Sequence, residues 1–203
     1  ELAGSGKSTD YFYQFYQDLL AKIQVNYVRS ASLPIKPVIK AEQVQQYQLP
    51  DKVDVYYANR QFLESQGFKL PDIGTKKVIL LPASDKGQEG KNQFLGKSIA
   101  YLSMRYEDQQ KQTIEDMDVE IAYYERDWSF FPYNNERKEN LHNPIISLVN
   151  DQDMMWEEKT RLSTTGLNNP MKVENTEQNQ KVITELVEKL SDGNYLKFSS
   201  IQA

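Results

Sequence analysis

The sequence contains no cysteine and only one histidine, His142. Without cysteine, the chain forms no disulfide, no thiolate metal site and no cysteine nucleophile. A Ser-His-Asp triad or a histidine metal site would have to be built around His142, which precedes Asn143-Pro144 in what reads as a surface turn. No G-x-S-x-G motif supplies a nucleophile to pair with it. We therefore expect no catalytic residue, no metal and no cofactor.

The sequence also lacks long apolar runs and an excess of positive charge. No stretch approaches the ~20 apolar residues of a membrane-spanning helix, and the first residues lack the basic and then apolar pattern of a signal peptide. Lys and Arg number 24 against 29 Asp and Glu, which gives a net charge of −5. An acidic surface without a basic run repels phosphate backbones, so nucleic acid is not an expected partner.

Residues 4–9 read GSGKST, which matches the last residues of the nucleotide-binding P-loop motif. The full motif requires a glycine five positions before Gly6, so that backbone amides can wrap the phosphates. That position is Glu1, whose carboxylate would face the phosphates. We predict no nucleotide site here. Instead, we expect a flexible lead over residues 1–8 and a helix that is capped by Ser8, Thr9 or Asp10.

Hydrophobic periodicity predicts the elements of the first half of the chain. A helix is expected over residues 9–22, followed directly by an alternating strand over 23–29. Residues 31–52 are rich in proline and glutamine, which favours an irregular connector with at most a short edge strand around Val38 and a short helix. A strand at 53–59, a short helix ended by Gly67, and a doubly buried strand at 76–82 then predict a β-α-β unit.

The second half of the chain shows further strands and helices. We expect a helix with Leu95, Ile99, Leu102 and Tyr106 on one face. The segments 118–125 and 128–134 read as a hairpin, and residues 142–150 as an apolar strand. A helix at 151–162 with Asp151 or Asp153 near its start, a loop at 164–175, a helix from Asn175 or Thr176 that stops at Asp192-Gly193, and a strand at 195–201 complete the pattern.

This mixture predicts an α+β fold. We expect residues 9–203 to form a single domain in which four or five helices flank one mixed central sheet of about six or seven strands.

Acidic side chains gather at residues 115–120 and 150–153. Such groups can bind calcium, but neither has the glycine and the later glutamate of an EF-hand loop. A solvated loop or a helix cap is the expected role. A carboxylate pair of the glycosidase type depends on the fold, and the sequence does not exclude it.

Aromatic and methionine side chains provide the candidate partner-binding surface. Alternation in a strand sends Trp128 and Phe130 to one face and Phe131 and Tyr133 to the other, so a sheet with one covered face buries only one pair. Met154, Met155 and Trp156 follow about twenty residues later. The seven residues are interpreted either as core or as a contact surface for a peptide or protein.

The order of these segments resembles the large extracellular segment of the bacteriocin-associated integral membrane protein family. The resemblance covers residues 9–201, and its most specific parts are "KKVILLPASDK" and "LHNPIISLVND". Members are immunity proteins of Gram-positive bacteria that are similar to ABC-transporter permeases. The resemblance implies a domain at the extracellular face of the membrane, tethered at both ends to the protein's own transmembrane helices and served by a separate cytoplasmic ATPase subunit.

These observations predict a non-catalytic domain that binds or senses an extracellular peptide or partner protein, in the export, immunity or sensing of antimicrobial peptides. The alternative is a free-standing secreted or surface interaction module, and a small carboxylate-dependent hydrolase is a third reading. Apolar spans in the parent gene directly outside residues 1 and 203 would distinguish the permease domain from the free module.

Overall fold

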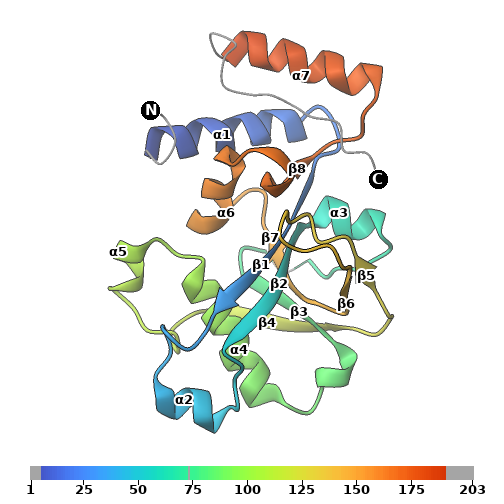
Figure 1. Cartoon of the computed structure of the whole chain (residues 1–203). Coiled ribbons are helices and arrows are strands. Elements are labelled where there is room, and N and C mark those ends of the chain that lie inside the picture. Colours follow the sequence, from blue (N-terminus) through green and yellow to red (C-terminus); the bar gives the residue numbers. More distant parts are fainter. Residues whose placement is uncertain (1–5, 73, 191–203) are drawn as a thin grey trace.

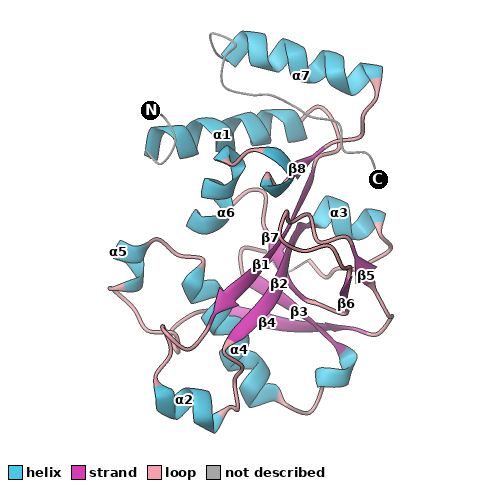
Figure 2. Cartoon of the chain, in the orientation of Figure 1, coloured by secondary structure: helices cyan, strands magenta, loops and turns pink. Residues whose placement is uncertain are grey.

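The structure, a computed structural model, describes residues 6–72 and 74–190 of the 203-residue chain. A mixed six-stranded sheet, in the order β4-β3-β7-β2-β1-β8, forms its centre, and β5 and β6 form a second, two-stranded sheet (Figure 1 and Figure 2). Helices lie around the larger sheet, which confirms the predicted α+β class.

The strands are β1 (Asn26–Pro34), β2 (Lys52–Asn59), β3 (Lys77–Pro82), β4 (Val119–Tyr124), β5 (Ser129–Phe130), β6 (Leu141–His142), β7 (Ile145–Val149) and β8 (Met171–Lys172). The α-helices are α1 (Gly6–Leu20), α2 (Ala41–Gln46), α3 (Arg60–Ser65), α4 (Glu89–Leu102), α5 (Tyr106–Gln109), α6 (Trp156–Thr160) and α7 (Glu177–Leu190). Short 3₁₀ helices cover Ala83–Asp85, Arg161–Ser163 and Gly166–Asn168.

The large sheet buries apolar side chains on both faces. The run in β3 alternates between them, because Ile79 and Leu81 join the larger core cluster while Val78 and Leu80 join the smaller one. Helices α1, α4 and α7 cover the larger cluster, and α3 covers the smaller one together with the segment around β5 and β6. The doubly buried strand predicted at 76–82 is therefore confirmed.

The predicted β-α-β unit is wrong, although strand, helix and strand follow in the expected order. β7 lies between β2 and β3, parallel to β2 and antiparallel to β3. β2 and β3 therefore run in opposite directions and do not pair. The apolar pattern of β7 suits a central strand, and such a pattern does not encode which neighbours the strand takes.

Three expectations for the N-terminal part need correction. Helix α1 begins at Gly6, so Ser8, Thr9 and Asp10 lie within the helix and do not cap it. The first strand runs from Asn26 to Pro34 instead of over residues 23–29, which takes four residues from the expected connector. Val38 is not in a strand but in a turn, where its N–H donates to the Ile35 carbonyl at 3.2 Å. The short helix expected in the connector is α2.

The helix expected to carry Tyr106 on its apolar face ends at Leu102. Tyr106 instead begins α5, and 70% of its surface is exposed. Leu95 and Ile99 are buried as predicted.

The hairpin predicted from residues 118–134 does not form. β4 pairs in parallel with β3, whereas β5 pairs with β6. Asn143 explains the difference, because its N–H donates to the Trp128 carbonyl and its side-chain oxygen accepts from the Trp128 N–H, both at 2.8 Å. These two bonds hold β5 beside the chain that enters β7.

The helix predicted over 151–162 and the loop predicted at 164–175 need correction, whereas the start of the last helix does not. The helix expected over 151–162 begins at Trp156, so neither Asp151 nor Asp153 lies at its start. The expected loop at 164–175 contains the short strand β8. Helix α7 follows Thr176 as predicted, and the Thr176 hydroxyl accepts the Asn179 N–H at 3.1 Å. The stop at Asp192-Gly193 and the strand at 195–201 lie outside the described residues.

The first and last described helices are neighbours. α1 and α7 contact each other and run in opposite directions, so Gly6 and Leu190 lie at the same end of this helix pair (Figure 1).

Candidate functional site

The aromatic residues around β5 form two ring pairs, but the predicted alternation holds only in part, because Tyr133 packs against the same smaller core cluster as Trp128 and Phe130. Trp128 and Phe130 stack on each other with ring centroids 5.9 Å apart, and Phe131 and Tyr133 form a separate edge-to-face pair at 4.9 Å. Phe130 is 3% exposed and belongs to the smaller core cluster, while Phe131 is 48% exposed. Trp128 is partly buried against Phe68, at a centroid distance of 4.3 Å.

Met154, Met155 and Trp156 lie elsewhere. Met154 is buried in the larger core cluster, and Met155 packs against that cluster. The ring of Trp156 lies under the guanidinium of Arg105, at 4.4 Å. The structure therefore does not bring the seven candidate residues together into one surface.

His142 and the acidic groups at 115–120 and 150–153, all among the described residues, form no metal-binding cluster. His142 is exposed beside Asn143. Within residues 6–72 and 74–190, no three histidine or acidic side chains gather closely enough to hold a metal ion. Asp151 instead accepts the Tyr16 hydroxyl at 2.6 Å and connects α1 to the ends of the central strands.

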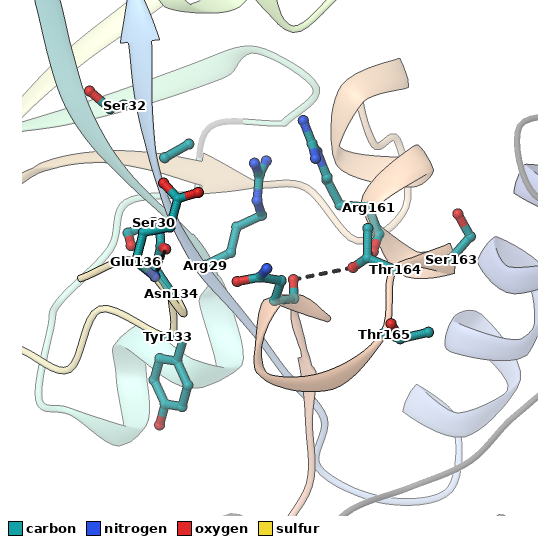
Figure 3. Close-up of a pocket in the computed structure, with 12 residues that line it drawn as sticks. Arg29, Ser30, Ser32, Tyr133, Asn134, Glu136, Arg161, Ser163, Thr164 and Thr165 are labelled. Carbon is teal, nitrogen blue, oxygen red and sulfur yellow. Dashed lines mark hydrogen bonds between the residues drawn. The ribbon is translucent and has the colours of Figure 1, made fainter. Parts of the chain in front are cut away.

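A polar cleft of about 510 Å³ opens along β1 (Figure 3). It is lined by one stretch of β1, by the segment after β5 and by the segment after α6: Arg29, Ser30, Ala31, Ser32, Tyr133, Asn134, Glu136, Arg161, Ser163, Thr164, Thr165 and Asn168. We call it the β1 cleft. In Figure 3, Asn134 and Glu136 stand on one side of it and Arg161 and Thr164 on the other.

The floor of the β1 cleft is an edge of the sheet that is free among residues 6–72 and 74–190. β8 pairs with β1 only at Asn26 and Tyr27, and the Val28 N–H still donates to the Pro170 carbonyl at 2.9 Å. Backbone groups of a strand alternate between its two sides, so Ser30 and Ser32 also point their N–H and C=O groups away from β2. Within the described part of the chain, no strand pairs with β1 on this side beyond β8.

Two segments form the walls. The Ser30 hydroxyl donates to the Pro132 carbonyl at 2.5 Å, which fixes the segment after β5 against β1. The Asn135 N–H donates to the side-chain oxygen of Asn168 at 3.3 Å and so links one wall to the other. Tyr133 adopts a φ of 46°, in the left-handed region that few residues other than glycine occupy.

Two guanidinium groups meet at Glu157 behind the cleft. Arg29 Nη1 donates to both carboxylate oxygens of Glu157, at 2.7 and 2.8 Å, and Arg161 Nε donates to one of them at 2.8 Å. Burial acts to lower the pKa of Arg29, but Glu157, Tyr27 and Tyr57 together outweigh this effect and raise the pKa, so Arg29 stays charged. Within the described residues, Nε and Nη2 of Arg29 and both Nη atoms of Arg161 make no hydrogen bond.

A third cation, Lys172, lies on β8, the strand that occupies the edge of β1 next to the cleft. Lys172 Nζ donates to the Leu167 carbonyl at 3.0 Å and to the Asn169 carbonyl, and it lies 5.3 Å from the centroid of the Tyr133 ring. Desolvation lowers the pKa of Lys172 to about 8. Glu136, on the opposite wall, is the one carboxylate among the residues that line the cleft.

Of the seven candidates from the sequence, only Tyr133 lines the β1 cleft. Sequence reasoning missed Ser30 and Ser32 because it ended the first strand at residue 29, and it gave no role to Arg29, the last residue of that predicted strand. The available signal was the stretch "RSAS", through which the strand can continue toward Pro34.

No family model, no curated protein and no solved structure matches this chain. Among the described helices, none has the length and apolar character needed to cross a membrane.

Proposed function

We propose that this chain is a non-catalytic peptide-binding domain that takes up an extended peptide as an added strand in the β1 cleft. The observation that supports it is the free edge at Ser30 and Ser32, enclosed between two walls. An unpaired edge offers N–H and C=O groups in the spacing of a sheet, and peptide recognition by strand addition uses such edges. Four residues of β1 line the cleft, and the first and last of them lie about 10 Å apart along the strand.

The walls suit a peptide because they supply polar contacts beside the backbone. The cleft volume falls in the range of ligand sites, roughly 300–1,000 Å³, although most such sites are more apolar. Unpaired polar groups on a bound peptide can meet the hydroxyl of Thr165 and the amides of Asn134 and Asn168. Backbone pairing then supplies general affinity, and the walls select side chains.

We further propose that the domain stands at the extracellular face of an ABC-transporter-like permease, where it binds or senses an antimicrobial peptide. Its support is the antiparallel packing of α1 and α7, which places Gly6 and Leu190 at one end of the helix pair. A domain held between two membrane spans needs its two ends on the same side. The cytoplasmic ATPase would be a separate subunit.

The test uses Ser32→Pro. Proline removes the N–H that points into the cleft but leaves the bonds from β1 to β2 in place, since Ser32 does not donate toward β2. A synthetic pool of random hexapeptides is passed over the immobilised protein, and retained peptides are identified by mass spectrometry. We expect the native protein to retain peptides, with amide NMR shifts at Ser30 and Ser32, and the variant to retain none.

Two controls keep the result specific. Ser32→Ala keeps the N–H and should bind like the native protein. Ala31→Pro removes an N–H that points toward β2, so it should lower the melting temperature. The proposal fails if the native protein retains no peptide, or if Ser32→Pro binds the pool as well as the native protein does.

A further inference from the structure

The β1 cleft has one closed end. The edge of β1 is occupied as far as Val28, whose N–H donates to the Pro170 carbonyl. Beyond this point no strand of the described residues pairs with the edge, and Arg29 is the first residue of β1 that lines the cleft. An added strand can therefore extend toward Pro34, but its other end must stop against the chain that leads into β8.

The charges at this closed end are mainly positive. Arg29 and Arg161 share the single carboxylate of Glu157, so one positive charge is left over. Among the described residues, Lys172, on the strand that closes the cleft, donates only to uncharged backbone carbonyls. Four guanidinium nitrogens of Arg29 and Arg161 make no hydrogen bond within the described residues and can donate to a ligand.

These charges select the direction of a bound peptide. A peptide parallel to β1 would place its amino end, and any free ammonium group, at the closed end beside the cations. A peptide antiparallel to β1 follows the direction of β8 and ends there with its carboxyl group. Guanidinium groups bind carboxylates with strong charge-assisted hydrogen bonds.

We propose that the β1 cleft recognises the C-terminus of a peptide, with the terminal carboxylate held by Arg29 and Arg161 at the closed end. This inference rests on the proposed peptide binding and adds its polarity and its chemical anchor. Glu136, on the opposite wall, then favours a basic side chain within the same peptide.

The experiment compares two synthetic hexapeptide pools with the same random sequences and acetylated amino ends. One pool carries free C-terminal carboxylates and the other carries C-terminal amides. We expect the native protein to bind members of the acid pool at least about tenfold more tightly than their amides, since a charge-assisted hydrogen bond is worth about that factor.

Arg161→Gln is the informative variant, because Arg161 is partly exposed and Arg29 still pairs with Glu157 when it is removed. The preference for peptides with a free C-terminal carboxylate over their amides should fall by at least about threefold. Arg137→Gln is the matched control. Arg137 lies close in sequence to the wall and pairs with Asp54 at 2.8 Å, but it does not line the cleft. It should keep the preference, with circular dichroism showing that both variants are folded.

The outcomes separate the two proposals. If acids and amides bind equally and both are lost in Ser32→Pro, the inference about the C-terminus is overturned and strand addition stands. If neither pool binds, both are overturned. If the protein instead dimerises through a contact that Ser32→Pro abolishes and peptides do not displace, a second copy occupies the edge and the inference is again overturned.

Discussion

At the residue scale, Asp151 shows how a polar side chain connects distant elements. It follows β7, and it accepts the Tyr16 hydroxyl from α1 and, at 3.4 Å, the side-chain N–H of Asn59 at the end of β2. Asn59 also accepts the Phe62 N–H and so caps α3. This network fixes the first helix over the ends of two parallel strands, β2 and β7.

We expect Asp151→Asn to change how stability depends on pH. Burial raises the pKa of Asp151, and the bonds from Tyr16 and Asn59 lower it only in part. Between the unfolded value near 3.9 and the raised folded value, the native state binds more protons than the unfolded state, so this side chain makes the protein less stable as pH rises. Asparagine keeps an acceptor for Tyr16 and removes the buried charge.

The measurement is urea unfolding of both proteins at several pH values from acid to neutral. The variant should gain stability relative to the native protein as pH increases, and above the folded pKa the difference should stay constant. A variant that is most destabilised at neutral pH would show that the carboxylate is a favourable acceptor despite its burial.

Phe130 and Phe131 are adjacent in sequence but should respond differently to substitution. Phe130 stacks on Tyr56 at 4.8 Å within the smaller core cluster, so Phe130→Ala should lower the free energy of unfolding by about 3–5 kcal/mol. Phe131 is exposed, and Phe131→Ala should change it by less than about 0.5 kcal/mol. Chemical denaturation measures both. Equal losses would contradict the alternation seen at β5.

At the element scale, α4 approaches the sheet closely through one glycine. A Cβ atom at Gly96 would lie 2.6 Å from Ile121 Cδ1 and 3.3 Å from Val119 Cγ1 on β4. Gly96 lies within a helix, where alanine is intrinsically more favourable by up to about 1 kcal/mol. Close packing against β4 therefore opposes helix propensity at this position.

A double-mutant cycle tests this contact. Gly96→Ala alone should lower stability by about 1 kcal/mol, because the methyl group forces Ile121 to move. Ile121→Val removes the clashing atom, so adding Gly96→Ala in that background should be neutral or stabilising. The free energy of unfolding of the four proteins gives the coupling. If the effects of Gly96→Ala and Ile121→Val on the free energy of unfolding simply add, the added methyl group does not act through its contact with Ile121.

At the scale of the whole molecule, the two core clusters share the strands of one sheet. β3 sends alternate side chains into each cluster, and β2 does the same through Tyr56 and Tyr57. Trp128 packs against the smaller cluster, and Trp156 directly follows Met155, which packs against the larger one. Loss of either cluster exposes the strands that support the other.

We therefore expect both faces to unfold together. Trp128→Phe and Trp156→Phe each leave one tryptophan, because the chain has only two. Fluorescence of each variant should give the same urea midpoint as its own far-ultraviolet circular dichroism. Two separated transitions would show that α1 and α7 melt from the sheet as an independent unit.

Much of the fold follows from local pattern. The alternation in Lys52–Asn59, the apolar run in β3, the apolar face of α4 and the capping residue Thr176 predicted elements that the structure confirms. Periodicity reports which side chains are buried, and it does so residue by residue. The position of β7 between β2 and β3, and the separation of β4 from β5, involve partners far apart in the chain, which no local pattern specifies.

The candidate site could not be predicted in the same way. Its floor exists because β8 pairs with only two residues of β1, and its walls come from segments about 100 and 130 residues away from β1 in sequence. The sequence by itself determined the class of fold, the absence of thiol chemistry and the opposite burial of Phe130 and Phe131, because composition and side-chain period are local properties. Only the tertiary structure decided which edge stays open and which charges meet there, since an unpaired N–H is defined by the neighbour that a strand does not have.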